Sequence, residues 1–400
     1  MLEYSPFSDE ILDDPFPIYR QLRDEAPAYY IDELDSWALS RFDDIWNAGA
    51  APATFRSPGP NLLSGLEDGQ ESWPSQESDR GSLFSLNPPV HTKLRQTLSP
   101  HFRPRAIMKL EPVIREIVSE RIAKVLPMGR CDIVQDLGLK LSVKVTCLII
   151  GLPVEDGDYL AGVVNRFFMR EPGIRGMAPD AQAAAEEIRE YLHKAIIERR
   201  KRGSEHGDLL DDYLGFKIDG TLLSDEELAG HLTTLVVGGT ETLPKVVAGG
   251  VLQLHRHPAQ RAELIANPSL ISDACTEIAR YEMPTQFLTR TIAKQVEMHG
   301  QTLRVGQGVL FLYRSGNRDE REFDEPDRFD IHRCPKRILT FGHGAHVCMG
   351  LHVAHLEARV LVEELLANMP DYAIEESEVI PARSEFVTGY LAVPITFKAR

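Results

Sequence analysis

The sequence predicts a mainly α-helical protein with small β-sheets, built as one domain over residues 1–400. From about residue 89 to residue 265, apolar side chains recur at spacings of three and four, as in VIREIVSERIAKVL and AAAEEIREYLHKAIIERR. Strand-like patterns are short and lie at residues 28–31 and 37–40, between about 285 and 313, and near the C-terminus. The chain has no internal repeat and no linker that divides it, so we expect a single domain.

Composition and charge limit the possible functions. The chain is 43% hydrophobic and 26% charged, which is typical of a globular protein. Its net charge of −16 argues against a nucleic-acid or anionic-membrane partner. The five cysteines are widely spaced and form no CxxC pair, which argues against disulfides and a zinc site. The N-terminus lacks a signal-peptide pattern, and no apolar run approaches the ~20 residues of a membrane helix. We expect a cytoplasmic, monomeric protein.

A long helix with a weak centre is predicted in the second half of the chain. Residues 224–227 (SDEE) form a capping-box signature, and helical periodicity continues to about residue 255. Gly238 and Gly239 each weaken a helix by about 1 kcal/mol relative to alanine. Pro244 lacks the N–H that would bond one turn back, so a kink is expected nearby. We therefore expect a ligand to lie against this point.

The stretch FGHGAHVCMG places Cys348 in a glycine-rich loop. Four explanations remain open from the residues: a phosphate-binding loop, a nucleophilic cysteine with His346 as base, a buried structural cysteine, and a thiolate ligand to haem iron. The flanking residues favour the fourth. Glycines allow the backbone to approach a flat macrocycle, Phe341 can shield the sulfur from water, and His346 can reach a carboxylate at the macrocycle rim.

These residues resemble a known family. Phe341, Gly344, His346, Cys348 and Gly350 match the pattern F-x-x-G-x-H-x-C-x-G of the cytochrome P450 family, and glycine at 342 is a further match. The sequence is similar to soluble bacterial members over nearly its whole length. The resemblance implies haem b held between a long distal helix and a proximal cysteine loop. Cys348 would then be the iron ligand.

The resemblance also implies a set of haem contacts. NPPVHTKLR places His91 and Arg95 on one helical face, where the alternative is an ordinary solvated face. Together with Arg290 and His346, these residues would bind the haem propionates. A second family segment, ExxR, implies a buried structural triad of Glu277, Arg280 and Arg333. The residues implied to contact the cofactor are His91, Arg95, Gly239, Arg290, Phe341, His346, Cys348 and Gly350.

The weak helix centre, GGTET, resembles the oxygen-binding stretch of the family. Gly238 and Gly239 would leave room for dioxygen, and Thr242 and Glu241 would belong to a proton-delivery route. The alternative for Glu241 is an ordinary carboxylate facing solvent. Leu243 and Pro244 depart from the family pattern, which leaves the efficiency of proton delivery open.

The resemblance implies a haem-thiolate monooxygenase that inserts one atom of O2 into a lipophilic small molecule. Electrons would come from an iron–sulfur ferredoxin and its NAD(P)H-dependent reductase. Two alternatives stay open: a peroxygenase that uses hydrogen peroxide, and a haem-thiolate sensor without catalysis. Because ferredoxins are acidic, a basic patch is expected near the cysteine loop. The candidates are Lys93, Arg103, Arg105, Lys336, Arg337 and Arg359.

The substrate pocket is the least determined part of the prediction. Residues 56–86 and 166–182 correspond to the variable lids of the family. For each candidate pocket residue, ordinary core packing is the alternative. Those implied to touch substrate are Val237, Gly238, Gln286, Leu288 and Phe386.

Overall fold

The computed structural model describes residues 2–57, 80–169, 178–203, 207–384 and 387–398. Helices form most of this part of the chain, as predicted. The first nine are α1 (Asp9–Asp13), α2 (Phe16–Glu25), α3 (Phe42–Gly49), α5 (Val90–Leu98), α6 (Pro104–Ile107), α7 (Glu111–Val125), α8 (Leu139–Ile150), α9 (Gly157–Phe168) and α10 (Pro179–Arg202). The others are α11 (Leu209–Gly215), α12 (Asp225–Thr240), α13 (Thr242–Arg256), α14 (Pro258–Ala266), α15 (Ile271–Tyr281), α16 (Tyr313–Gly316) and α17 (Leu351–Asn368).

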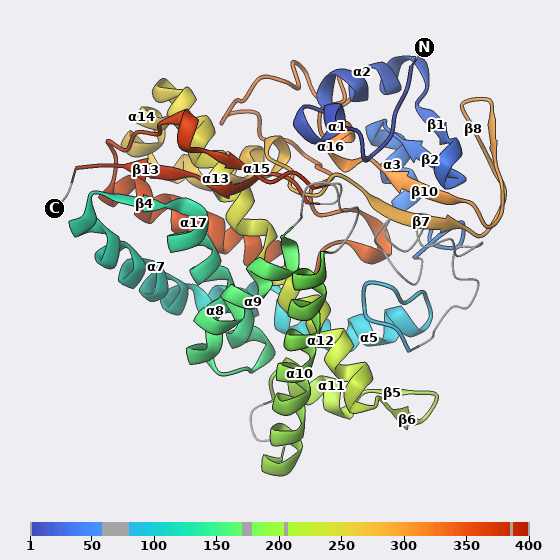
Figure 1. Ribbon diagram of the computed structural model, residues 1–400, viewed down its shortest axis with the longest axis horizontal. Coiled ribbons are helices and arrows are strands. Elements are labelled where there is room, and N and C mark those ends of the chain that lie inside the picture. Colours follow the sequence, from blue (N-terminus) through green and yellow to red (C-terminus); the bar gives the residue numbers. More distant parts are fainter. Residues whose placement is uncertain (1, 58–79, 170–177, 204–206, 385–386, 399–400) are drawn as a thin grey trace.

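The strands of the largest sheet lie at the right in Figure 1, and most of the long helices lie at the left and below it. The largest sheet has five strands in the order β1-β2-β10-β7-β3, with β2 and β10 parallel and the other pairs antiparallel. They are β1 (Ala28–Ile31), β2 (Ser36–Leu39), β3 (Phe55–Arg56), β7 (Leu288–Ile292) and β10 (Gly308–Phe311). The two-stranded sheets pair β4 (Arg130–Asp132) with β13 (Pro394–Thr396), β5 (Lys217–Ile218) with β6 (Thr221–Leu222), β8 (Val296–Met298) with β9 (Gln301–Leu303), and β11 (Ile380–Pro381) with β12 (Tyr390–Ala392).

The long predicted helix is present, but it breaks at Glu241 into α12 and α13. Ser224 and Glu227 form the predicted capping box at its start. The break lies one turn before Pro244, whose ring cannot donate the next backbone hydrogen bond. Within the described ranges, residues 225–256 alone have the length and composition of a membrane span, and 72% of the most apolar window is buried inside the protein.

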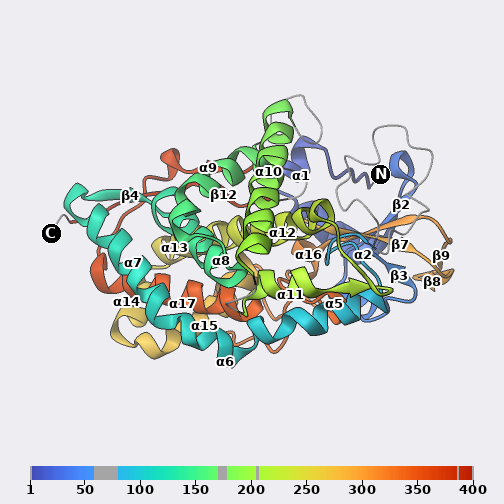
Figure 2. The same cartoon turned by 90° about the horizontal axis from the view of Figure 1, so that it is seen from below.

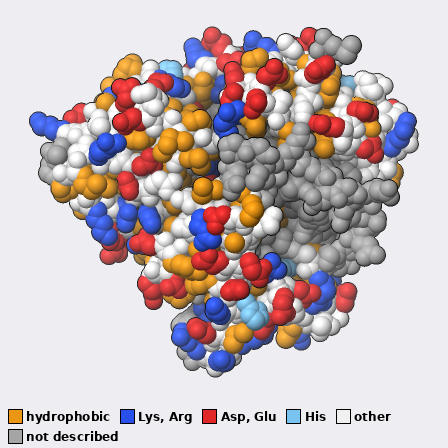
Figure 3. Space-filling model, viewed as in Figure 1, with side chains coloured by type: hydrophobic (Ala, Val, Ile, Leu, Met, Phe, Trp, Pro, Cys, Tyr) orange, Lys and Arg blue, Asp and Glu red, His pale blue; other side chains and the backbone are white. Residues whose placement is uncertain are grey.

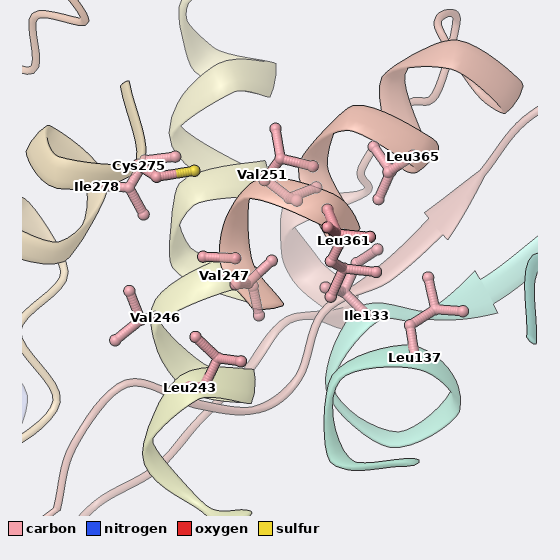
Figure 4. Close-up of a cluster of buried hydrophobic side chains, with 14 of the residues drawn as sticks. Ile133, Leu137, Leu243, Val246, Val247, Val251, Cys275, Ile278, Leu361 and Leu365 are labelled. Carbon is pink, nitrogen blue, oxygen red and sulfur yellow. The ribbon is translucent and has the colours of Figure 1, made fainter. Parts of the chain in front are cut away.

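The helix α13 is the centre of the largest hydrophobic core. Figure 4 shows Val247 and Val251 of α13 facing Leu361 of α17, with Ile278 of α15 on another side. Pro244 fits against Gly138, where an added Cβ would lie only 2.9 Å from the proline ring. The small residue on one side and the rigid ring on the other therefore fix the position of the helix break.

A buried ion-pair cluster supports the segment before the cysteine loop, as the sequence predicted. Arg280 Nε lies 2.7 Å from Glu277 Oε2, and Arg333 Nε lies 3.2 Å from Glu277 Oε1. Arg280 also donates to the carbonyl oxygens of Asn317 and Pro326, at 2.7 and 3.0 Å. Because the Glu277 carboxylate and the Arg280 guanidinium are fully buried, removing either one would leave an uncompensated charge. The cluster therefore braces the fold and contacts no part of the cavity described below.

Candidate active site

A cavity of about 580 Å³ lies between the α12–α13 break, α8, strand β7 and the cysteine loop. Its size is in the range of cofactor and ligand sites. Most of its wall is apolar, and its polar groups come from a few distinct elements. The predicted site residues on its wall are His91, Arg95, Val237, Gly238, Gly239, Thr242, Leu288, Arg290, Phe341, His346, Cys348 and Gly350.

The cysteine loop is held in shape by glycines with left-handed backbone angles. Gly342 has φ of 65° and Gly344 has φ of 74°, a region that L-amino acids with a Cβ rarely adopt. Gly344 also lies against the backbone of Gly49 in α3, where a Cβ would collide with it. The Cys348 N–H donates to the carbonyl of Phe341 at 2.8 Å, which closes the loop. These contacts direct the sulfur toward the cavity.

The Cys348 sulfur is open to the cavity, although it lies deep inside the protein. Burial raises the pKa of the thiol, while the Gly350 N–H and the Arg95 guanidinium act in the opposite direction. Both of these groups stabilise a negatively charged thiolate and interact only weakly with a neutral thiol. A metal ion bonded to the sulfur removes the proton and makes use of both. The loop is therefore suited to a metal-bound thiolate.

Two histidines and two arginines, which we call the His–Arg cluster, face the cavity beside this loop: His91, Arg95, Arg290 and His346. The rings of His91 and His346 lie 4.1 Å apart. Arg290 is 5% exposed and donates to the Thr289 carbonyl at 2.6 Å. Arg95 donates to the Val347 carbonyl, and His346 Nε2 lies 3.2 Å from Ser57 Oγ. The cluster comes from α5, β7 and the cysteine loop.

The His–Arg cluster lacks the negative charge that its composition requires. Both ring nitrogens of His91 are buried without a hydrogen-bond partner. Burial, together with the neighbouring arginines, lowers the pKa of His91 to about 4 and that of His346 to about 2. Burial also lowers the pKa of Arg95 and Arg290, and neither guanidinium pairs with a carboxylate in the part of the chain that the structure describes. A dianionic group with two carboxylates, such as the propionates of haem, would satisfy these donors.

The opposite wall of the cavity is formed by the helix break. A Cβ added to Gly238 would meet open space, whereas one added to Gly239 would press on the Thr146 hydroxyl. Thr242 Oγ1 donates to the Gly238 carbonyl at 3.4 Å, a long hydrogen bond that another acceptor could replace. The break therefore presents a small open space and one hydroxyl group to the cavity.

Three predicted residues are not placed on the cavity wall. Glu241 is buried on another side of the helix, where its Oε1 lies 2.9 Å from Lys245 Nζ. Gln286 is fully buried and accepts a hydrogen bond from the Tyr19 hydroxyl at 2.8 Å, which turns it toward α2. Phe386 lies outside the described residues. Glu241 is thus drawn away by a partner one turn along its own helix.

The structure adds residues that the sequence analysis did not single out. The cavity is also lined by Phe84, Thr146, Phe167, Phe168, Thr233, Thr234, Met283 and Glu357. Four of these eight residues are phenylalanines or methionine, which a sequence cannot distinguish from core positions. Glu357 could have been noticed, because it is a lone acid within the apolar stripe of α17.

The predicted basic patch is divided by its ion pairs. Arg337 pairs with Glu322 and Asp43, and Arg359 pairs with Glu111 and Glu363. Arg103 and Arg105, between α5 and α7, are exposed. In Figure 2 the helices α5, α6 and α17 lie along the same edge of the molecule. On the face seen in Figure 3, acidic and basic side chains are interspersed.

The fold and the site define a protein suited to binding haem. Residues 159–383 match the sequence model of the family described as Cytochrome P450. The whole chain is 33% identical to the putative cytochrome P450 123 of Mycobacterium tuberculosis, of which it covers 98%. It is 32% identical to vitamin D(3) 25-hydroxylase of Pseudonocardia autotrophica, over 100% of this chain and 97% of that protein.

A solved structure agrees with these matches. The crystal structure of CYP109E1 from Bacillus megaterium in complex with testosterone has a TM-score of 0.84 and 26% identity to this chain, over 98% of this chain and 99% of that one. The chain belongs to the cytochrome P450 family. It is a monooxygenase whose cofactor is haem, which uses O2 and receives its electrons from a redox partner.

Proposed function

We propose that the protein hydroxylates or epoxidises a lipophilic small molecule with electrons from a ferredoxin and its NAD(P)H-dependent reductase. The observation that carries the proposal is the convergence of Cys348, the His–Arg cluster and the α12–α13 break on one apolar cavity. A cytoplasmic location belongs to the proposal and is supported by the five unpaired cysteines.

The residues of the cavity fit haem in a defined way. Cys348 would bind the iron, Phe341 and Gly350 would enclose the sulfur, and the His–Arg cluster would hold the propionates. Gly239 would lie opposite, where a larger residue would collide with Thr146 of α8. When bound, haem with a thiolate ligand supplies the electron density that favours cleavage of the O–O bond.

Thr242 is the residue we assign to proton delivery at the helix break. Its hydroxyl lines the cavity and is held only by the 3.4 Å bond to Gly238. A hydroxyl in this position can donate one proton toward the cavity and take another from water. Glu241 is paired with Lys245 away from the cavity, so we assign it no direct contact with the reacting atoms.

The substrate class follows from the cavity wall. Val237, Gly238 and Leu288 lie with the phenylalanines Phe84, Phe167 and Phe168 on the wall. Burial of an apolar ligand against such a surface stabilises its complex by about 25 cal/mol per Å². One relative is named vitamin D(3) 25-hydroxylase and another was crystallised with testosterone, so sterols and steroids are the first compounds to test.

The test is a titration of the purified haem protein with a compound library, followed by turnover of the hits. A substrate should shift the Soret band as it displaces water from the iron. With a ferredoxin system, the same compound should raise NADPH consumption and yield an oxygenated product. A clear Soret shift by hydrophilic compounds alone would contradict the proposed substrate class, and binding without product would favour a sensor.

The ferredoxin part of the proposal has a separate test. Arg105→Glu should slow reduction by ferredoxin several-fold while leaving reduction by dithionite unchanged, because steering between charged surfaces acts on association. Arg337→Glu should have a smaller effect, since Glu322 and Asp43 already offset its charge. Unchanged ferredoxin kinetics in both variants would contradict this docking surface.

A further inference from the structure

Several hydrogen-bond donors without a partner lie together behind the cavity wall, outside the active site. They are the Tyr4 hydroxyl, Gln286 Nε2 and the Nε atoms of Arg314 and Arg318, each buried and unbonded within the described ranges. The side chain of Gln286 is 0% exposed, whereas Arg314 keeps partial exposure. Buried donors in proteins are nearly always paired, so a group of unpaired ones in one place indicates a missing acceptor.

Tyr19 of α2 connects these donors. Its hydroxyl donates to Gln286 Oε1 at 2.8 Å, and its ring lies 6.2 Å from the ring of Tyr4. The ring of Phe16, also in α2, lies 6.5 Å from that of Tyr19. The guanidinium carbon of Arg314 lies 4.9 Å from the centre of the Phe16 ring. Figure 1 shows α2 beside α16, the helix that carries Arg314, near the N-terminus.

The positive charge of Arg314 has no bound counter-ion. In the part of the chain that the structure describes, its side chain takes part in no hydrogen bond and no ion pair. Burial lowers the pKa of its guanidinium, and the nearby Arg318 acts in the same direction. Arg318 itself is paired with Asp327, at 3.1 Å. The charge of Glu282 acts in the opposite direction on Arg314, but among the described residues no ion pair joins the two.

We propose that Arg314, Gln286 and Tyr4 form a second binding site, which takes a small oxyanion, either a phosphate or a carboxylate group. A guanidinium can bind two oxygen atoms of such a group at once. The amide of Gln286 and the hydroxyl of Tyr4 would donate to the same ion from the buried side. The partly exposed Arg314 lies at the entrance, so the ion can arrive from solvent.

The bound anion would connect the N-terminal part of the chain to the wall of the active-site cavity. Gln286 faces α2, but Thr285 and Leu288 of the same segment line the cavity. An ion held on the outer side of this segment would fix its position, so anion binding and substrate binding should strengthen each other. This connection rests on the proposed function, whereas the anion site itself does not.

Thermal unfolding of the ferric holoenzyme tests the site. Sodium phosphate and sodium acetate are compared with sodium chloride at equal pH and ionic strength. At least one of the two oxyanions should raise the unfolding temperature in a saturable way, by about 2 °C at ten times its dissociation constant. A response to phosphate alone would identify phosphate esters as the natural class of ligand, and a response to acetate would identify carboxylates. The absence of a saturable increase with either ion would overturn the proposal.

Substitutions test where the ion binds. Arg314→Met should abolish the response, and the exposed Arg130→Met should retain it. Gln286→Glu should also abolish it, because the chain then supplies its own carboxylate beside Arg314. Tyr4→Phe removes only a hydroxyl and should weaken anion binding about tenfold, so it decides the question if the other variants do not fold. An unchanged response in Arg314→Met or in Tyr4→Phe would overturn the proposal.

Titration with a compound that shifts the Soret band tests the connection to the cavity. A saturating concentration of the effective ion should lower the dissociation constant of this compound about fivefold in the wild type and leave it unchanged in Arg314→Met. Equal constants with and without the ion in the wild type would refute the connection. If no compound shifts the band, the proposed function fails, while the unfolding temperatures still decide whether the anion site exists.

Discussion

The two walls of the cavity differ in what they contain. The cysteine-loop side presents a sulfur atom and the His–Arg cluster, in which both ring nitrogens of His91 are buried without a hydrogen-bond partner. The side formed by α12 and α13 presents glycines, threonines and apolar side chains around a broken helix. Charge placed in a dry interior is costly unless a partner neutralises it, whereas small apolar groups leave space without such a cost. The first wall is therefore built to bind one cofactor tightly, and the second to admit exchangeable ligands.

Among the predicted effects, that of replacing the Cys348 sulfur on the cysteine-loop side should be the largest. Cys348→Ser should abolish the spectrum of a thiolate-ligated carbonyl adduct and reduce oxygenation to background, because a serine hydroxyl does not supply the thiolate. Absorption spectra of the reduced protein under carbon monoxide measure the change. The exposed Cys334→Ser is the matched control and should retain the wild-type spectrum. A normal spectrum in Cys348→Ser would refute the ligand assignment.

Removing one cation of the His–Arg cluster should weaken haem binding next most strongly. Arg290→Met leaves a buried carboxylate of the cofactor without its partner, which costs about 3 kcal/mol, or roughly a hundredfold in affinity. The haem-free variant should be at least as stable as wild type, because an unpartnered buried charge is removed. Haem titration and denaturant unfolding measure the two quantities. The exposed Arg130→Met should change neither, and equal affinity in Arg290→Met would contradict the propionate assignment.

Substitution of Thr242 at the α12–α13 break should change the amount of peroxide released rather than the affinity for haem. Thr242→Ala should leave haem affinity unchanged and raise the peroxide released per product several-fold, because only proton delivery is affected. Thr302→Ala on the exposed strand β9 is the control. Peroxide release equal to that of wild type would remove Thr242 from the proton route.

The smallest expected effect is a pH dependence of the haem-free protein. The folded-state pKa of His91, about 4, lies below the usual value near 6.5. The unfolded chain therefore binds more protons below pH 6.5, and stability falls as the pH decreases from there toward 4. Between pH 6.5 and 5 the loss should reach about 2 kcal/mol in the free energy of unfolding. Denaturant unfolding measures it. His91→Asn should remove the His91 share of the slope and leave the share of His346, whose pKa is also lowered, while His255→Gln should change neither.

The sequence predicted the fold class and the two walls, but only part of their detail. The cysteine loop could be recognised because glycine positions and short-range spacing encode its shape. The capping box and Pro244 likewise located the long helix and its break through local chemistry. The contact between His91 and His346 could not be predicted from local patterns, because most of the chain lies between these two residues.

Side-chain direction is what the sequence could not supply. Glu241 lies where the family pattern expects it, yet Lys245 one turn later holds it away from the cavity. Gln286 is drawn to Tyr19, a partner near the N-terminus that no periodicity indicates. The partner of Glu357 is Ser142 of α8, which is 215 residues away in the sequence and could not be identified from local pattern. The placements of Gln286 and Glu357 depend on long-range packing, whereas that of Glu241 depends on a partner one turn away.

The unsatisfied nitrogens of His91 and the buried guanidinium of Arg290 have a consequence for the protein in the cell. In newly made chains that have not bound haem, these groups are buried without a negatively charged partner. The free energy of unfolding of such chains is lower than that of the haem-bound protein by the free energy that haem binding adds. Such chains open more often and become substrates for proteases. The steady-state amount of this enzyme should therefore follow the supply of porphyrin during growth more closely than the level of its messenger RNA.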